Sequence, residues 1–479
     1  MLFNSLQFIV FFPIVVAAYF ALNPKFRWIL LLIASYYFYM CWNYKYVVLI
    51  AITTSVNYLA GIGISKSKSK FFRILYLTTG LVVSLGILFF FKYFNFFGES
   101  LNFIFEKINI FYRVPSYHYL LPVGISFFTF QTLSYTIDVY FKKQEVEYHF
   151  GIFALYVSFF PQLVAGPIER STNLLPQFYK KNSINYERIR DGLVIMLWGL
   201  LKKVVIADRI SEYVNIVYGS PDNFTGSHLI LATVFFSIQI YCDFSGYSDI
   251  AIGTAKIMGY DLMTNFRRPY FAQNIREFWQ RWHISLSTWF RDYFYIPLGG
   301  NRVSKGRNYF NLFSTFLVSG LWHGANWTFV IWGALHGFYS IFALFTKKLR
   351  TKLNNIVGIT KFPKFHSLLN IVITYILVYF SWIFFRAANL QDAITVIKNM
   401  FIFKSSVSLN LFKFSADLYI SLISIILFLL IEVFTERNIL IGKLKRVSPI
   451  LKVTLFVILL FIIFIFGEWN EADFLYFQF

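Results

Sequence analysis

Charged residues are scarce in this sequence. Asp, Glu, Lys and Arg make up 14% of the 479 residues, whereas soluble domains carry about 25%. Hydrophobic residues make up 57% of the chain, a share that excludes intrinsic disorder as well as an ordinary soluble fold. The apolar runs are long and continuous, whereas the strands of a membrane β-barrel are short and alternate between apolar and polar residues. The composition therefore predicts an all-α integral membrane protein.

Cysteine is also scarce, and several catalytic sequence patterns are missing. Cys41 and Cys242 are the only cysteines, so no disulfide framework and no zinc–thiolate site is predicted. Both lie in apolar stretches, and we expect both to be buried. The sequence contains no G-x-S-x-G, P-loop, G-x-G-x-x-G or H-E-x-x-H pattern, which argues against an α/β-hydrolase acyl-enzyme and a nucleotide site. We predict no metal and no bound cofactor.

The apolar stretches predict a polytopic protein with about eleven transmembrane helices, at roughly 20 residues per span. Residues 308–346 contain no charged residue and are interrupted by Gly320, Gly324 and Gly333. Such a stretch predicts broken or re-entrant helices, which are tolerated where they are buried in protein or line a wet cavity. No internal repeat is visible, and we expect one membrane domain over residues 1–479.

The net charge of +21 predicts contact with anionic lipid through cytoplasmic loops rather than with nucleic acid. Basic residues gather at 65–73, at 347–366 and at 437–452, and these loops are expected to be cytoplasmic. The tail after residue 467 carries Glu468, Glu471 and Asp473 and no basic residue, so the tail is expected outside. Counting helices back from the first basic loop also places the N-terminus outside.

Residues 260–310 combine many arginines with many aromatic residues. The run Asn274-Ile-Arg-Glu277 has the form of a capping box and predicts a helix start, and Pro297-Leu-Gly-Gly300 predicts its end. We interpret this segment as one amphipathic helix at the cytoplasmic membrane face. Forked guanidinium groups suit phosphate oxygens, and contact with lipid head groups is an equally good interpretation. The arginines concerned are Arg267, Arg268, Arg276 and Arg281.

Three histidines lie in apolar surroundings, where polar groups are costly and mark functional candidates. His323 is flanked by glycines inside the charge-free stretch, a pattern typical of a residue that faces a membrane cavity. His283 lies forty positions earlier, in the aromatic and basic segment. His336 lies thirteen residues after His323, roughly 20 Å along a continuous helix, so we predict a structural role for it. Imidazole titrates near neutral pH and is the usual general base.

Two carboxylates lie in the apolar stretch 228–259. Asp243 and Asp249 need partners if they are buried, and the expected ones are Arg267, Arg268 and the arginines from Arg276 to Arg291. We favour a structural ion pair over a catalytic role for both acids.

Seven segments, taken in order, resemble the membrane-bound O-acyltransferase (MBOAT) family. They are Val123-Gly-Ile-Ser-Phe-Phe-Thr-Phe130, Phe160-Pro-Gln-Leu-Val-Ala-Gly-Pro-Ile-Glu169, Asp243-Phe-Ser-Gly-Tyr-Ser-Asp249, Asn265-Phe-Arg-Arg-Pro-Tyr270, Phe278-Trp-Gln-Arg-Trp-His283, Leu321-Trp-His-Gly-Ala-Asn-Trp327 and Ser381-Trp-Ile-Phe-Phe-Arg386. Together they span most of the chain, with core motifs at about 119–346. They are most similar to the bacterial branch with the alginate O-acetylation protein, peptidoglycan O-acetyltransferases and the teichoic acid D-alanyl transferase, and the ending 474–479 also resembles alginate-type members.

The resemblance implies a site and a fold. The family's essential histidine matches His323, and its second polar position matches His283. Trp322 and Asn326 lie in the same motif and are expected to contact substrate. The family fold is a ring of tilted helices around a central tunnel, with the acyl donor entering from the cytoplasm and the acceptor from the other side.

The sequence therefore predicts an O-acyltransferase of the cytoplasmic membrane. We expect it to O-acetylate an exported polysaccharide from a thioester such as acetyl-CoA or an acyl carrier, together with an extracytoplasmic glycan acetyltransferase-type partner. His283 is expected to orient donor or acceptor, or to donate a hydrogen bond to the oxyanion. The alternatives are a carrier-fed D-alanyl transferase, a transporter or flippase without bond chemistry, and a structural anchor of a glycan-modifying complex.

Overall fold

The computed structural model describes residues 1–117, 119–164, 166–403, 411–412, 415–437, 448–469 and 474–475. Within these residues the chain is helical and forms no β-strand, which confirms the predicted all-α fold. The chain divides into two compact units, one of residues 1–196 and 247–263 and the other of residues 197–246 and 264–479. Each unit is described separately below.

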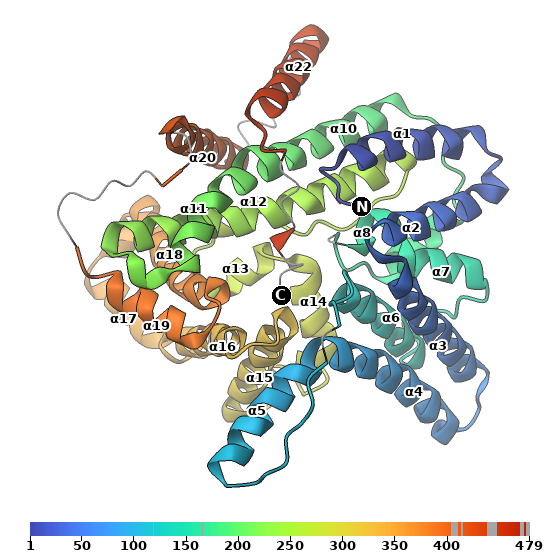
Figure 1. The fold of residues 1–479 in the computed structure, drawn as a ribbon, viewed down its shortest axis with the longest axis horizontal. Helices are drawn as coiled ribbons and strands as arrows, with labels where there is room; N and C mark the ends of the chain where they lie inside the picture. Colours follow the sequence, from blue (N-terminus) through green and yellow to red (C-terminus); the bar gives the residue numbers. More distant parts are fainter. Residues whose placement is uncertain are drawn as a thin grey trace. The chain divides into compact units, whose positions relative to one another are not determined.

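The first unit contains the N-terminal helices. Within it, α3 packs against both α4 and α6, as the blue and teal helices of Figure 1 show. Its helices are α1 (Leu6–Ala21), α2 (Arg27–Asn43), α3 (Val47–Lys66), α4 (Lys70–Leu88), α5 (Phe94–Lys107), α6 (Ile125–Tyr140), α7 (Phe150–Ser158), α8 (Phe160–Leu163) and α9 (Ser171–Phe178). Two long helices, α10 (Tyr186–Leu200) and α12 (Gly226–Met258), contribute residues to both units.

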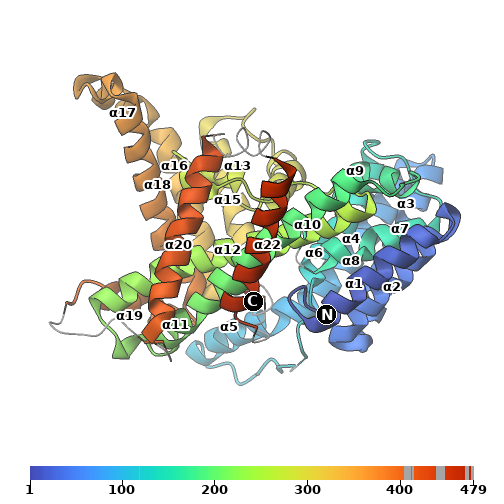
Figure 2. The same ribbon diagram turned by 90° about the horizontal axis from the view of Figure 1, so that it is seen from above.

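The second unit contains the segment rich in arginine and aromatic residues and the C-terminal helices. Within it, α16 packs against α13, α15 and α18, and α16 and α18 run side by side in Figure 2. The helices are α11 (Asp208–Gly219), α13 (Ile275–Arg281), α14 (Ile284–Phe290), α15 (Lys305–His323), α16 (Trp327–Phe345), α17 (Lys347–Ile356), α18 (Pro363–Arg386), α19 (Leu390–Asn399), α20 (Ser415–Glu436) and α22 (Pro449–Phe466). The tryptophans Trp282, Trp332 and Trp382 are fully buried in its core.

The charge-free stretch 308–346 forms two helices joined by a tight turn, which confirms the predicted break. Helix α15 ends at His323, and Gly324 is extended, with φ −160° and ψ 150°. The side chain of Asn326 then caps α16 by accepting a hydrogen bond from the amide of Thr328 at 3.0 Å. A break at this point places His323 at the end of a helix rather than in the middle of one.

Glycine at position 320 lets α15 and α16 approach closely. A Cβ atom at this position would lie 2.3 Å from the carbonyl oxygen of Phe329, whereas a Cβ atom at Gly306 of the same helix would meet nothing within 4 Å. We expect Gly320→Ala to destabilise the protein by about 1–3 kcal/mol because the backbone of α16 must shift. The matched change Gly306→Ala should be neutral or stabilising. Thermal unfolding of both variants in detergent checks this, and equal midpoints would contradict the predicted close packing.

Six helices are long and apolar enough to cross a membrane by length and composition, among the described residues. They occur in the segments Pro24–Lys66, Lys70–Lys107, Gly226–Met258, Trp327–Phe345, Pro363–Arg386 and Ala416–Glu436, and the shorter apolar helices Leu6–Ala21 and Ile450–Phe466 accompany them. Large apolar side chains are exposed on these helices, including Phe345 and Phe464, as expected for a surface covered by lipid. The chain is thus a multi-pass membrane protein, although the predicted number of about eleven spans is not confirmed.

Two predictions about this architecture are wrong. The segment after Asn274 starts a helix as predicted, with the Asn274 side chain accepting from the amide of Glu277 at 2.9 Å. That helix ends at Arg281, and His283, with φ 41°, starts α14. Trp282, which lies between the two helices, is fully buried, and its ring centroid lies 5.1 Å from that of Trp382. Cys41, expected to be buried, is exposed.

Some residues on which the predicted topology and the family resemblance rest lie outside the described residues. This applies to Lys443, Lys445 and Arg446 of the third basic loop, to Glu471 and Asp473 of the tail, and to 476–479 of the alginate-type ending.

Candidate active site

The two predicted catalytic histidines meet in the second unit. His323 is the last residue of α15, and His283 is the residue before α14. Their ring centroids lie 6.5 Å apart, although forty positions separate the two residues in the sequence. Trp322 lies beside both, with its ring 6.0 Å from that of His283 and 5.1 Å from that of His323. The predicted pair and one predicted substrate-contact residue therefore form one cluster.

His323 lies in an aromatic enclosure. Its side chain is buried, with 2% of its surface exposed, and the rings of Trp332 and Phe385 lie 4.9 Å and 5.4 Å away. The C-terminal end of a helix carries partial negative charge and favours a cation. His323 is placed where the imidazolium formed by proton uptake would be stabilised while bulk water is excluded.

The ring of Trp332, which packs against His323, carries a buried hydrogen-bond donor. Its side chain is fully buried, and its indole Nε1 makes no hydrogen bond to any residue that the structure describes. Buried donors without an acceptor are costly and uncommon. The sequence reasoning missed this residue, which lies nine positions after His323 on the next helix.

The hydrogen bonds of His283 define its tautomer. The Asn265 side-chain oxygen accepts from the amide of Ser285 at 3.3 Å and from its hydroxyl at 2.9 Å, so this atom is the oxygen rather than the nitrogen of the amide group. His283 Nδ1 lies 3.2 Å from the same oxygen and must carry the proton. Burial lowers the pKa of His283 to about 3, so the ring is neutral and Nε2 carries a lone pair. His283 can therefore accept a hydrogen bond through Nε2.

His336 has a different environment from the other two histidines. Trp279 Nε1 donates to His336 Nδ1 at 3.3 Å, and His336 Nε2 lies 3.1 Å from the Ser381 hydroxyl. Because an indole only donates, Nδ1 must accept and Nε2 must donate. Both nitrogens are thus occupied, which supports the structural role that the sequence predicts for His336.

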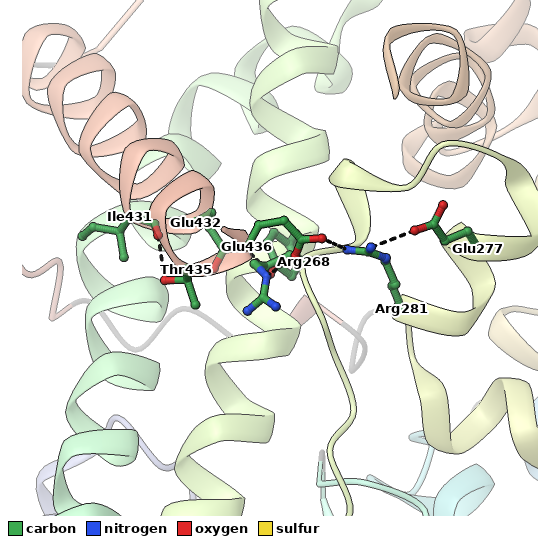
Figure 3. Close-up of polar contacts among 8 residues, drawn as sticks. Arg268, Glu277, Arg281, Ile431, Glu432, Thr435 and Glu436 are labelled. Atoms are coloured by element: carbon green, nitrogen blue, oxygen red, sulfur yellow. Dashed lines mark hydrogen bonds and ion pairs between the residues drawn. The ribbon is translucent and has the colours of Figure 1, made fainter. Parts of the chain in front are cut away.

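Two of the four predicted donor-binding arginines are engaged in ion pairs. Glu436, at the end of α20, accepts from Arg268 Nε at 2.5 Å through one oxygen and from Arg281 at 2.8 Å through the other. Arg281 also pairs with Glu277 at 2.7 Å. Figure 3 shows Glu436 between the two guanidinium groups. Two arginines and two carboxylates leave this cluster without net charge, so it offers little attraction for a phosphate.

Of the remaining residues predicted to bind substrate, Arg267 and Arg276 are exposed, whereas Asn326 makes structural hydrogen bonds. Neither arginine forms an ion pair within the described part of the chain. The side chain of Asn326 caps α16 and also donates to the carbonyl oxygen of Ala388 at 2.8 Å. Asn326 therefore holds the turn after His323, and its amide group is occupied by these structural contacts.

Asp243 forms a buried ion pair, but with a different partner than predicted. Lys203 Nζ lies 2.8 Å from Asp243 and 2.8 Å from Asp208, and all three side chains are buried. The expected arginine partner is wrong, because Lys203, in the π-helical turn Leu201–Ala207, reaches Asp243 on α12. The other oxygen of Asp243 accepts from the amide of Leu475 at 2.8 Å. Sequence reasoning missed Lys203, although two adjacent lysines inside an apolar stretch are a signal of functional or structural use.

The two acidic residues of the 243–249 motif, both on α12, have different surroundings. The ring of Phe244, the residue after Asp243, packs on His283 with ring centroids 4.6 Å apart. The ion pair of Lys203 and Asp243 therefore lies one residue away from a side chain that contacts His283. Asp249 is half-buried on the part of α12 that belongs to the first unit.

These features define a polytopic membrane protein with a buried pair of imidazoles. The model of the membrane-bound O-acyltransferase family matches residues 114–388, a range that contains both histidines. The chain belongs to this family and is an O-acyltransferase.

Three relatives illustrate the range of similarity. The probable alginate O-acetylase AlgI of Pseudomonas aeruginosa is 40% identical, over 84% of this chain and 75% of the relative. The peptidoglycan O-acetyltransferase of Helicobacter pylori is 37% identical, over 84% of this chain and 80% of its own length. The teichoic acid D-alanyltransferase of Streptococcus thermophilus is 29% identical, over 55% of this chain and 68% of its own length.

Proposed function

We propose that this protein O-acetylates an exported or cell-surface polysaccharide, using an acetyl group from a cytoplasmic thioester such as acetyl-CoA. Residues 1–479 would form one acyltransferase domain in the cytoplasmic membrane, working with an extracytoplasmic glycan acetyltransferase-type partner. The approach of His283 and His323 to 6.5 Å inside the aromatic enclosure is the observation that carries the proposal. The names of the relatives support the acetyl group and the polysaccharide acceptor.

The residues support a base-catalysed acyl transfer. His323 removes the proton from an acceptor hydroxyl as its oxygen attacks the thioester carbonyl, and the C–S bond then breaks. The thiolate leaves and takes the proton from the His323 imidazolium, so the new ester and a free thiol are formed. His283 Nε2 accepts a hydrogen bond from the attacking hydroxyl and orients it, because its neutral tautomer has no proton on that nitrogen. The Trp332 indole donates a hydrogen bond that stabilises negative charge on the carbonyl oxygen.

The donor phosphates are proposed to bind Arg267 and Arg276, since Arg268 and Arg281 are neutralised by Glu436 and Glu277. We expect Arg267→Gln/Arg276→Gln to raise the KM for acetyl-CoA at least about tenfold with little change in kcat, because the loss of even one charge-assisted hydrogen bond costs about 1.5–3 kcal/mol. The matched control Arg302→Gln/Lys305→Gln removes the same charge from exposed positions in the same segment. Steady-state kinetics on purified variants check this. An unchanged KM would contradict donor binding by the two arginines and favour their contact with lipid head groups.

A D-alanyl transferase is the alternative within the family. The D-alanyl relative aligns over 55% of this chain, whereas the acetylating relatives align over 84%, which favours the acetyl group. The test supplies acetyl-CoA and a D-alanyl carrier thioester separately to membranes that contain the protein and a polysaccharide acceptor. Acetyl ester formation supports the proposal, and transfer of D-alanine alone would overturn it.

A further inference from the structure

The first unit contains a basic pocket between the start of α4 and the end of α6. Its volume is about 400 Å³, and it is lined by Lys68, Lys70, Arg73, Tyr140, Phe141 and Lys142. Four of these six residues are cations and none is an acid. The pocket contains none of the residues proposed for catalysis.

Two of the cations are held by the backbone around them. Arg73 donates to the carbonyl oxygen of Tyr140 at 2.8 Å, and its guanidinium carbon lies 5.3 Å from the centroid of the same residue's ring. Its Nε is buried and makes no hydrogen bond to a described residue. Lys142 adopts φ 58°, and its amide bonds to the carbonyl oxygen of Val139 at 3.1 Å. The turn after α6 thus fixes the backbone of Lys142 at the rim of the pocket.

The electrostatics of this pocket are unfavourable without an anion. Lys70 and Arg73 lie in the first turn of α4, where the helix end carries partial positive charge and an acidic residue is normally preferred. The first turn contains no acid, and Ser69 makes no capping hydrogen bond. Uncapped amide groups at a helix start bind phosphate readily. The cations, the uncapped helix start and the cavity all favour the same ligand.

We propose that this pocket binds a phosphate group. Arginine and lysine side chains around an uncapped helix start suit the charge and the several acceptor oxygens of phosphate. The volume leaves room for the group to which the phosphate is attached. That phosphate belongs either to an anionic lipid head group or to a soluble phosphate compound.

The test measures binding to the full-length protein in a neutral detergent. The probes are phosphatidylglycerol in mixed micelles, phosphatidylcholine as the zwitterionic comparison, inorganic phosphate and coenzyme A. The variant Lys68→Gln/Lys70→Gln/Lys142→Gln removes three cations of the pocket. The matched control Lys347→Gln/Lys348→Gln/Lys352→Gln removes three exposed cations from α17. We expect the apparent Kd for the phosphate probe to rise at least about tenfold in the pocket variant, equivalent to about 1.4 kcal/mol, and to stay unchanged in the control.

The probes distinguish the source of the phosphate. Binding of phosphatidylglycerol alone that weakens in the pocket variant identifies a head-group site, and binding of inorganic phosphate or coenzyme A that weakens in the pocket variant identifies a soluble ligand. Should the triple variant fail to fold, the single change Lys142→Gln at an exposed residue gives the same comparison. The proposal is overturned if no phosphate probe binds the wild-type protein, if the pocket variant binds every probe as tightly as wild type, or if both triple variants lose binding equally.

Discussion

Lys203→Met is expected to lower the free energy of unfolding by about 3–5 kcal/mol, because it leaves buried carboxylates without their cation. Lys203 pairs with both Asp208 and Asp243, and the exposed fractions of the three side chains are 1%, 5% and 4%. Denaturant or thermal unfolding of the purified protein in detergent measures the loss.

Two further variants distinguish the loss of the buried ion pairs from the loss of one positive charge as such. Lys180→Met removes an exposed cation and should change stability by less than about 0.5 kcal/mol. The combination Lys203→Met/Asp208→Asn/Asp243→Asn removes all three charges and should recover much of the loss, since neutral replacements of buried ion pairs are often tolerated. A Lys203→Met protein as stable as Lys180→Met would show that the buried network has no such role.

His323→Gln is expected to lower the transfer rate by about 10²–10⁴-fold, the usual contribution of a general base. Glutamine keeps polarity and approximate size but cannot take up the proton. His283→Ala should leave reduced but measurable transfer, because His283 orients rather than deprotonates. His336→Ala should keep most of the transfer rate, because both of its ring nitrogens are engaged in structural hydrogen bonds.

The measurement is kcat for acetyl transfer with purified, monodisperse variants. Unfolding midpoints are compared in parallel, since losing a buried hydrogen bond costs about 1–3 kcal/mol and could imitate a loss of chemistry. A folded His323→Gln protein whose rate lies within about tenfold of wild type would contradict the assignment of His323 as the general base.

The fold was predictable where local chemistry decides it. Continuous apolar runs predict membrane helices, and the glycines around His323 predict the break that ends α15. The break at His283 was not predictable, because positive φ is uncommon for every residue other than glycine. Here the left-handed conformation coincides with hydrogen bonds to Asn265, eighteen residues earlier, and such a pairing depends on the folded chain.

The candidate site was predictable only in part. The residues alone indicate a buried imidazole near cations, and the family resemblance points to His283 as the second member. The partners of the charged residues could not be read from sequence distance. Glu436 reaches Arg268 and Arg281 from more than 150 positions away, and Asp243 pairs with Lys203 rather than with a nearby arginine.

The most direct test supplies acetyl-CoA with an isotopically labelled acetyl group to the cytoplasmic face of membranes that hold the protein, its partner and the polysaccharide. Mass spectrometry then measures labelled acetyl esters on the polysaccharide for wild type and His323→Gln. Labelled esters with the wild type and almost none with a well-folded His323→Gln protein are the result we predict. Labelled esters formed at similar rates by both proteins would contradict it.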